Sequence, residues 1–135
     1  MKLSRFFYTT LRETPSEATM ASHIFLMRGG YIKPLSTGIY SILPIGHRVM
    51  KKIENIIREE MNRIGGLELD LPIVQTAELW SESGRYNAIG EELLRFKDRN
   101  NHNMVLAMTH EEAVTDASRY VLSSYKQLPF MLYQF

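Results

Sequence analysis

The chain contains 135 residues, of which 44% are apolar and 23% charged, the composition of a single globular domain rather than of a disordered chain. Its formal net charge of +1 comes without a long run of Lys or Arg, so charge alone does not predict nucleic-acid binding. The absence of cysteine excludes disulfides, thiolate nucleophiles and cysteine-based zinc sites.

Residue spacing argues against two further classes of function. The four histidines lie far apart and include no i, i+4 pair, so we expect no metal site. The apolar stretch at residues 6–8 ends too early for a signal peptide, and no stretch approaches membrane-spanning length. We therefore expect a cytoplasmic protein with no membrane partner.

Glycine and proline residues mark the ends of the first predicted elements. A helical pattern covers residues 16–28 and ends at Gly29-Gly30. A loop through Pro34 follows, and residues 38–43 then alternate as a strand or extended segment that Pro44 closes.

The strongest helical pattern in the chain covers residues 45–64. Its apolar side chains form one stripe: Ile45, Val49, Ile53, Ile56, Ile57, Met61 and Ile64. Gly65-Gly66 ends the helix, and residues 67–71 alternate as a strand up to Pro72. Periodicity alone favours an ordinary core helix with this stripe buried.

The second half is predicted to contain a polar loop, a hairpin, a helix and a last strand. The loop covers residues 81–90, and the hairpin joins residues 94–98 to residues 104–108 through an Asn-rich turn. The helix is expected over residues 111–125 and the strand over residues 130–135. Because the sequence stops inside a strand pattern, we expect a cut chain.

The junction between the second hairpin strand and the last helix carries the most informative residues. Thr109 and Glu111 lie two positions apart on an extended backbone and can present both oxygens to one cationic amine. The alternative is a capping box, in which Thr109 and Glu112 satisfy free N–H groups at the helix start. The two interpretations are compatible, because Glu112 can cap while Glu111 points elsewhere.

Several motifs in one order resemble the N-terminal part of the catalytic domain of bacterial-type prolyl-tRNA synthetases, which are class II aminoacyl-tRNA synthetases. The resemblance covers essentially the whole chain and rests on the order of its motifs rather than on any single one. These motifs are Gly29-Gly30-Tyr31-Ile32, Gly38 to Pro44, Ile57-Arg58-Glu59-Glu60-Met61, Pro72, Ala77-Glu78-Leu79-Trp80, Ser83-Gly84-Arg85, Lys97-Asp98-Arg99-Asn100, Thr109-His110-Glu111-Glu112 and Leu128-Pro129.

The resemblance implies an α+β fold, with an antiparallel sheet flanked by helices. Residues 45–72 would be motif 1, which forms the dimer interface in the family, and its residues here are Ile53, Ile57, Met61 and Pro72. Residues 108–112 would be the loop that binds proline through Thr109 and Glu111, with His110 and Glu112 as cap and loop support. The secondary ammonium of proline has two N–H donors, which suit a carboxylate and a hydroxyl.

The implied activity is that of a proline–tRNA ligase, with ATP and Mg, proline and tRNA-Pro as cofactor and partners, acting as a homodimer. Motifs 2 and 3, the editing insertion and the anticodon-binding domain would follow these residues. We therefore expect no catalytic residue among the 135, no ATP held by them alone and no ligase activity. One alternative is a short non-catalytic paralogue that acts as a dimerisation or regulatory module. Another is a relative that binds proline or an adenylate without tRNA chemistry.

Three other residues have both a functional and a structural interpretation. Arg85 could reach a phosphate or tRNA, but pairing with Glu82 or Glu91 is the favoured prediction. Trp80, the sole tryptophan, is predicted to pack in a core or interface. For His110 we expect a solvated or backbone-bonded imidazole.

Overall fold

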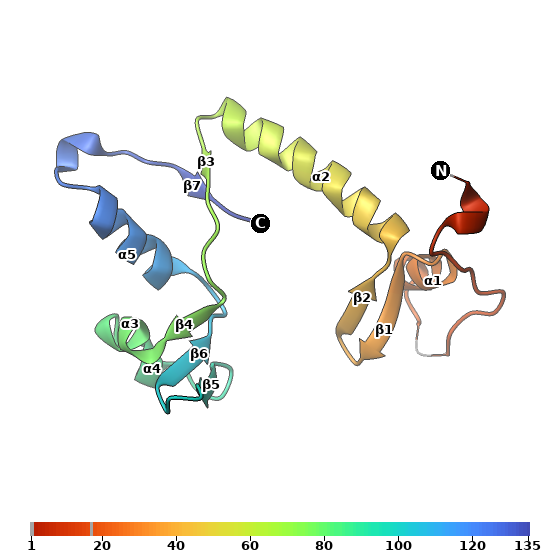
Figure 1. The fold of residues 1–135 in the computed structure, drawn as a ribbon, viewed down its shortest axis with the longest axis horizontal. Coiled ribbons are helices and arrows are strands. Elements are labelled where there is room, and N and C mark those ends of the chain that lie inside the picture. Colours follow the sequence, from red (N-terminus) through yellow and green to blue (C-terminus); the bar gives the residue numbers. More distant parts are fainter. Residues whose placement is uncertain (1, 17) are drawn as a thin grey trace. The chain divides into compact units, whose positions relative to one another are not determined.

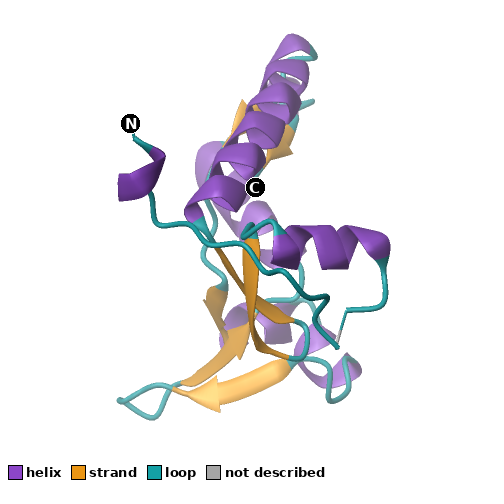
Figure 2. Cartoon of the chain, turned by 90° about the vertical axis from the view of Figure 1, so that its right-hand side faces the viewer, coloured by secondary structure: helices purple, strands orange, loops and turns teal. Residues whose placement is uncertain are grey.

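The computed structural model describes residues 2–16 and 18–135 (Figure 1). Contacts between residues divide the chain into two compact units, residues 1–63 and residues 64–135. Both units combine helices with short strands (Figure 2), so the predicted α+β class is confirmed.

The described residues of the first unit form two helices, a hairpin and a short 3-10 helix. These are the 3-10 helix Leu3–Arg5, α1 (Ala21–Arg28), β1 (Ile32–Ser36), β2 (Ile39–Ile42) and α2 (Pro44–Arg63). Helix α2 agrees closely with the prediction over residues 45–64. Its first turn packs closely against Tyr31, the residue just before β1. A Cβ at Gly46 would lie only 2.4 Å from the carbonyl oxygen of Tyr31.

Two predictions for the first unit are wrong, one in extent and one in type. The helix expected from residue 16 begins at Ala21, and ahead of it the N–H of Ala18 donates to the carbonyl of Pro15. Residue 17, which the predicted helix included, lies outside the described residues. The predicted loop through Pro34 is strand β1, which pairs antiparallel with β2 in a register that sets Ile32 opposite Ile42. Pro34 is tolerated at this position because β1 has a neighbouring strand on one side only.

The second unit contains two small sheets and three helices. Its elements are β3 (Leu67–Glu68), β4 (Val74–Thr76), α3 (Ala77–Glu82), α4 (Arg85–Ala88), β5 (Leu94–Lys97), β6 (Asn103–Leu106), α5 (Glu111–Val121), the 3-10 helix Tyr125–Gln127 and β7 (Leu132–Tyr133). One sheet is antiparallel in the order β4-β6-β5, and the other is a parallel pair of β3 and β7.

The predicted hairpin is confirmed as β5 and β6, but four other predictions in this unit are wrong in extent or type. The expected polar loop over residues 81–90 is largely helix, in which Gly84, at φ 78°, separates α3 from α4. Helix α5 ends at Val121 rather than at residue 125. The strands expected over residues 67–71 and 130–135 are only two residues long, because β3 and β7 pair with each other over a short register.

The core of the second unit lies where α3 packs against β6. Trp80, Leu93 and Val105 are its largest fully buried side chains. The indole N–H of Trp80 donates to the side chain of Gln75 at 2.8 Å, so its polar atom is satisfied inside the core. The predicted core packing of Trp80 is therefore confirmed.

Candidate functional site

The site lies at the junction between β6 and α5. Pairing of β6 with β4 continues past the strand, since the N–H of Ala107 donates to the carbonyl of Ile73. Helix α5 then begins at Glu111 with His110 as N-cap, and no side chain caps its N-terminus. The predicted capping box is therefore wrong: Thr109 precedes the N-cap, and the carboxylate of Glu112 is bound elsewhere.

Arg85 bonds to residues on both sides of the N-cap of α5. One guanidinium nitrogen donates to both carboxylate oxygens of Glu112 at 3.0 Å and to Glu111 at 3.2 Å. The other donates to the hydroxyl of Thr109 at 3.0 Å. The predicted pairing of Arg85 with Glu82 or Glu91 is therefore wrong. Glu82 instead pairs with Arg119 at 2.7 Å.

Buried neighbours fix the position of Arg85. Glu112 is only 6% exposed and accepts a further hydrogen bond from the hydroxyl of Ser83 at 2.8 Å. The guanidinium carbon lies 4.8 Å from the centre of the Trp80 ring, at a cation–π distance. A buried carboxylate needs such a partner, because an unpaired charge inside a protein is strongly destabilising.

The predicted substrate residues, Thr109 and Glu111, lie together in the structure. The Glu111 side chain is 68% exposed, so its ion pair with Arg85 contributes little to folding. A hydrogen bond from Thr109, then one from its own backbone N–H and then Arg85 lower the pKa of Glu111 below its usual range. Glu111 is thus an ionised, exposed carboxylate held by a neighbouring hydroxyl.

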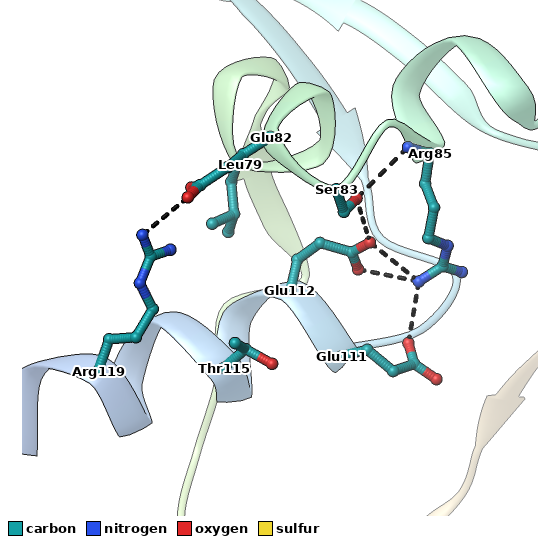
Figure 3. A pocket seen from close by; sticks show the side chains of 8 residues that line it. All are labelled: Leu79, Glu82, Ser83, Arg85, Glu111, Glu112, Thr115 and Arg119. Atoms are coloured by element: carbon teal, nitrogen blue, oxygen red, sulfur yellow. Dashed lines mark hydrogen bonds and ion pairs between the residues drawn. The ribbon is translucent and has the colours of Figure 1, made fainter. Parts of the chain in front are cut away.

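An open cavity of about 600 Å³ lies beside this cluster (Figure 3). Its walls come from α3, the turn after it, the start of α4, and α5. Its lining residues are Leu79, Glu82, Ser83, Arg85, Glu111, Glu112, Thr115 and Arg119. Figure 3 shows the Arg85 guanidinium directed at Glu111 and Glu112, and Arg119 directed at Glu82. A second cavity, of about 260 Å³, also reaches Glu111 and is lined by His110 and by Leu69, Leu71 and Leu132.

His110 differs from its prediction. Its Nε2 is buried and has no hydrogen-bond partner within the described part of the chain, whereas a solvated or backbone-bonded ring was expected. The ring lines the second cavity beside Glu111.

The predicted dimer residues lie outside this site. Ile53 and Ile57 are on α2 and are 51% and 45% exposed, while Met61 is half-buried. Pro72 belongs to the second unit and is exposed. The prediction of a core helix with a buried stripe is therefore not supported for Ile53 and Ile57 in this chain.

Residues 2–16 and 18–135 contain neither a cluster of metal-binding side chains nor a membrane-spanning helix. No group of three or more His, Asp or Glu side chains in these residues is placed to hold a metal ion. None of their helices has the length and apolarity needed to span a membrane.

Ser83 and Arg85 are the site residues whose role the sequence did not predict. They belong to a motif on which the family resemblance rests, but nothing in their local spacing points to partners more than 20 residues away.

The sequence comparison identifies a relative along nearly the whole chain. The chain is 53% identical over 134 residues to a proline–tRNA ligase of Ehrlichia ruminantium (strain Gardel), covering 99% of this chain and 32% of that protein. It therefore spans about a third of the length of this curated relative. No family model matches the chain. The expected resemblance to prolyl-tRNA synthetases is confirmed at this level of identity.

Solved structures with the same fold are synthetase chains. The RNA-binding domain of threonyl-tRNA synthetase from Cryptosporidium parvum Iowa II matches with a TM-score of 0.67 and 29% identity over 75% of this chain and 25% of that one. Prolyl-tRNA synthetase from Cryptosporidium parvum, solved with L-proline and AMP, matches with a TM-score of 0.64 and 15% identity over 84% and 22%. Histidyl-tRNA synthetase from S. aureus matches with a TM-score of 0.59 and 22% identity, over 76% of this chain and 24% of that one. The expected class II synthetase fold is thereby confirmed.

Proposed function

We propose, on the premise that this chain is a homologue of part of a proline–tRNA ligase, that it forms the amino-acid-binding region of such an enzyme. The enzyme activates proline with ATP and transfers it to tRNA-Pro. The carboxylate of proline attacks the α-phosphorus of ATP and pyrophosphate leaves; a terminal tRNA hydroxyl then attacks the activated carbonyl and AMP leaves. This chemistry needs no nucleophile from the protein, only positioning and charge stabilisation.

The observation that carries the proposal is the exposed, ionised carboxylate of Glu111 beside the hydroxyl of Thr109 at a cavity. The ammonium of proline would donate one N–H to Glu111 and the other to Thr109, and the first bond is assisted by opposite charges. A relative with the same fold was solved with L-proline and AMP, which supports an amino-acid site in this fold.

The phosphate-binding groups are proposed to lie in the part of the relatives that this chain does not span. The two arginines that line the larger cavity, Arg85 and Arg119, are both paired with carboxylates. They are therefore poorly suited to bind ATP, whose phosphates need cations that are not already neutralised. Bound ATP with Mg would supply the adenylyl group that activates proline. Dimerisation through α2 and a cytoplasmic location are further parts of the proposal.

Calorimetric titration of the full chain with L-proline tests the binding role directly. We expect heat from the wild type, and a loss of affinity of about tenfold or more in Glu111→Ala, because a charge-assisted hydrogen bond is removed. Glu78→Ala is the control, since Glu78 is an exposed carboxylate in the first turn of α3, as Glu111 is in α5. Equal affinity in the wild type and Glu111→Ala, or no heat from the wild type, would contradict the proposal.

Pyrophosphate exchange tests the proposed division of labour between this chain and the rest of its relatives. We expect no proline-dependent exchange by the purified 135 residues, because the groups that bind ATP are proposed to lie elsewhere. Turnover by these residues would show that they carry the phosphate site themselves.

A further inference from the structure

The contacts of Arg85 have a consequence for how a substrate amine would be recognised. We propose that Arg85 is a positioning residue, which holds Thr109 and Glu111 as a pair of hydrogen-bond acceptors with one unneutralised negative charge. This inference rests on the proposed function, because it concerns the same amine site.

A single side chain, that of Arg85, contacts both proposed substrate residues. The guanidinium of Arg85 donates to Thr109 at 3.0 Å and to Glu111 at 3.2 Å from its two terminal nitrogens. Because a guanidinium is planar and rigid, these two contacts set the separation of the hydroxyl and the carboxylate.

Arg85 is itself held in place by buried side chains. It lies over the ring of fully buried Trp80 and pairs with buried Glu112, which Ser83 holds in turn. Glu112 thus anchors Arg85, and Arg85 transmits that anchoring to the exposed side chain of Glu111.

The directions of these hydrogen bonds leave Thr109 and Glu111 as acceptors. Arginine only donates, so the hydroxyl of Thr109 must accept from Arg85. The proton of that hydroxyl is then donated to Glu111, the contact that contributes most to the lowered pKa of Glu111. Thr109 and Glu111 can then only accept further hydrogen bonds, which suits a ligand that donates two N–H groups.

The charges of this cluster do not cancel. Glu111 and Glu112 carry two negative charges, and Arg85 neutralises one of them. One negative charge remains at the exposed end, where a single ammonium would bind. Without Arg85, Glu111 would lose one of its contacts, and Glu112 would be a buried unpaired charge.

The test combines L-proline calorimetry with a carbon-13 NMR titration of the Glu111 carboxylate in the full chain. In Arg85→Met we expect proline affinity to fall about tenfold or more and the pKa of Glu111 to rise towards its ordinary value. Arg85→Lys keeps the charge but cannot bridge three partners, so it should recover part of the pKa change and little of the affinity. Arg63→Met, which removes an arginine paired with Glu60 on α2, is the control and should change neither quantity.

A double variant guards against unfolding. Arg85→Met with Glu112→Gln removes the buried charge together with its partner and leaves Thr109 and Glu111 intact. Wild-type affinity in this variant, or an unchanged pKa of Glu111 in Arg85→Met, would overturn the proposal. If the wild type binds no proline while the pKa still rises in Arg85→Met, the proposed function is overturned, and the role of Arg85 towards a substrate is overturned with it.

Discussion

The hydroxyl of Thr109 is the largest single cause of the lowered pKa of Glu111. A carboxylate whose pKa is lower in the folded chain stabilises the fold above its ordinary value of 4.5, and this contribution is lost as the pH falls through the lowered folded pKa. In Thr109→Val we expect the pKa of Glu111 to rise, because the donor is gone. NMR titration of the carboxylate measures this, with Thr115→Val as the control one turn further along α5. An unchanged pKa in Thr109→Val would contradict the contact.

Trp80 provides a second test at the residue scale. Its ring is fully buried, and its N–H satisfies buried Gln75. Trp80→Phe should lower the free energy of unfolding by about 1–3 kcal/mol, because the Gln75 oxygen is left buried without a donor. Urea denaturation measures the change. Adding Gln75→Met should restore part of the loss, and no restoration would show that lost volume, not the hydrogen bond, is the cause.

At the scale of elements, the sequence predicted those whose patterns are long and regular. Helix α2 and the β5–β6 hairpin agree with prediction because one has a stripe over five turns and the other has turn residues between its arms. Strand β1 was missed because Pro34 interrupts its pattern, and its pairing with β2 is a tertiary effect. Helices α3 and α4 were missed because they are short and contain the polar residues that are typical of loops.

Gly46 tests the contact between α2 and the β1–β2 hairpin. A methyl group there would lie within 2.4 Å of the Tyr31 carbonyl oxygen, which belongs to the backbone and cannot swing aside. Gly46→Ala should therefore destabilise the first unit by about 1–3 kcal/mol, despite the higher helix propensity of alanine. Thermal unfolding followed by circular dichroism measures this. Lys52→Ala, at an exposed position of the same helix, should be nearly neutral; equal stability of the Gly46→Ala chain and the wild type would contradict the close packing.

The candidate site was predictable in part. The pairing of Thr109 with Glu111 follows from their spacing, and in the structure the Thr109 hydroxyl bonds to Glu111, which lines the cavity. Their partner Arg85 could not be predicted, because it lies 24 and 26 residues away and reaches them only through the packing of α3 and α4 beside α5. The capping box failed for the same reason, since Glu112 bonds to residues brought from that distance.

At the scale of the whole molecule, the exposed stripe of α2 is proposed to bind a second copy. The side chains of Ile53 and Ile57 are about half exposed, whereas apolar side chains in a core are buried. Ile53→Glu should weaken self-association, because a carboxylate in an apolar interface is costly to desolvate. Sedimentation equilibrium measures this, with Tyr120→Glu on α5 as the control at a fully exposed position. Unchanged association in Ile53→Glu would contradict a dimer through α2.

A crystal structure of the full chain with L-proline would test the central claim most directly. The claim predicts the ring nitrogen within hydrogen-bond distance of both the Thr109 hydroxyl and the Glu111 carboxylate, with Arg85 still bound to Glu112. Proline bound with its nitrogen on other groups, or with its carboxylate on Arg85 and Glu111 displaced, would contradict it.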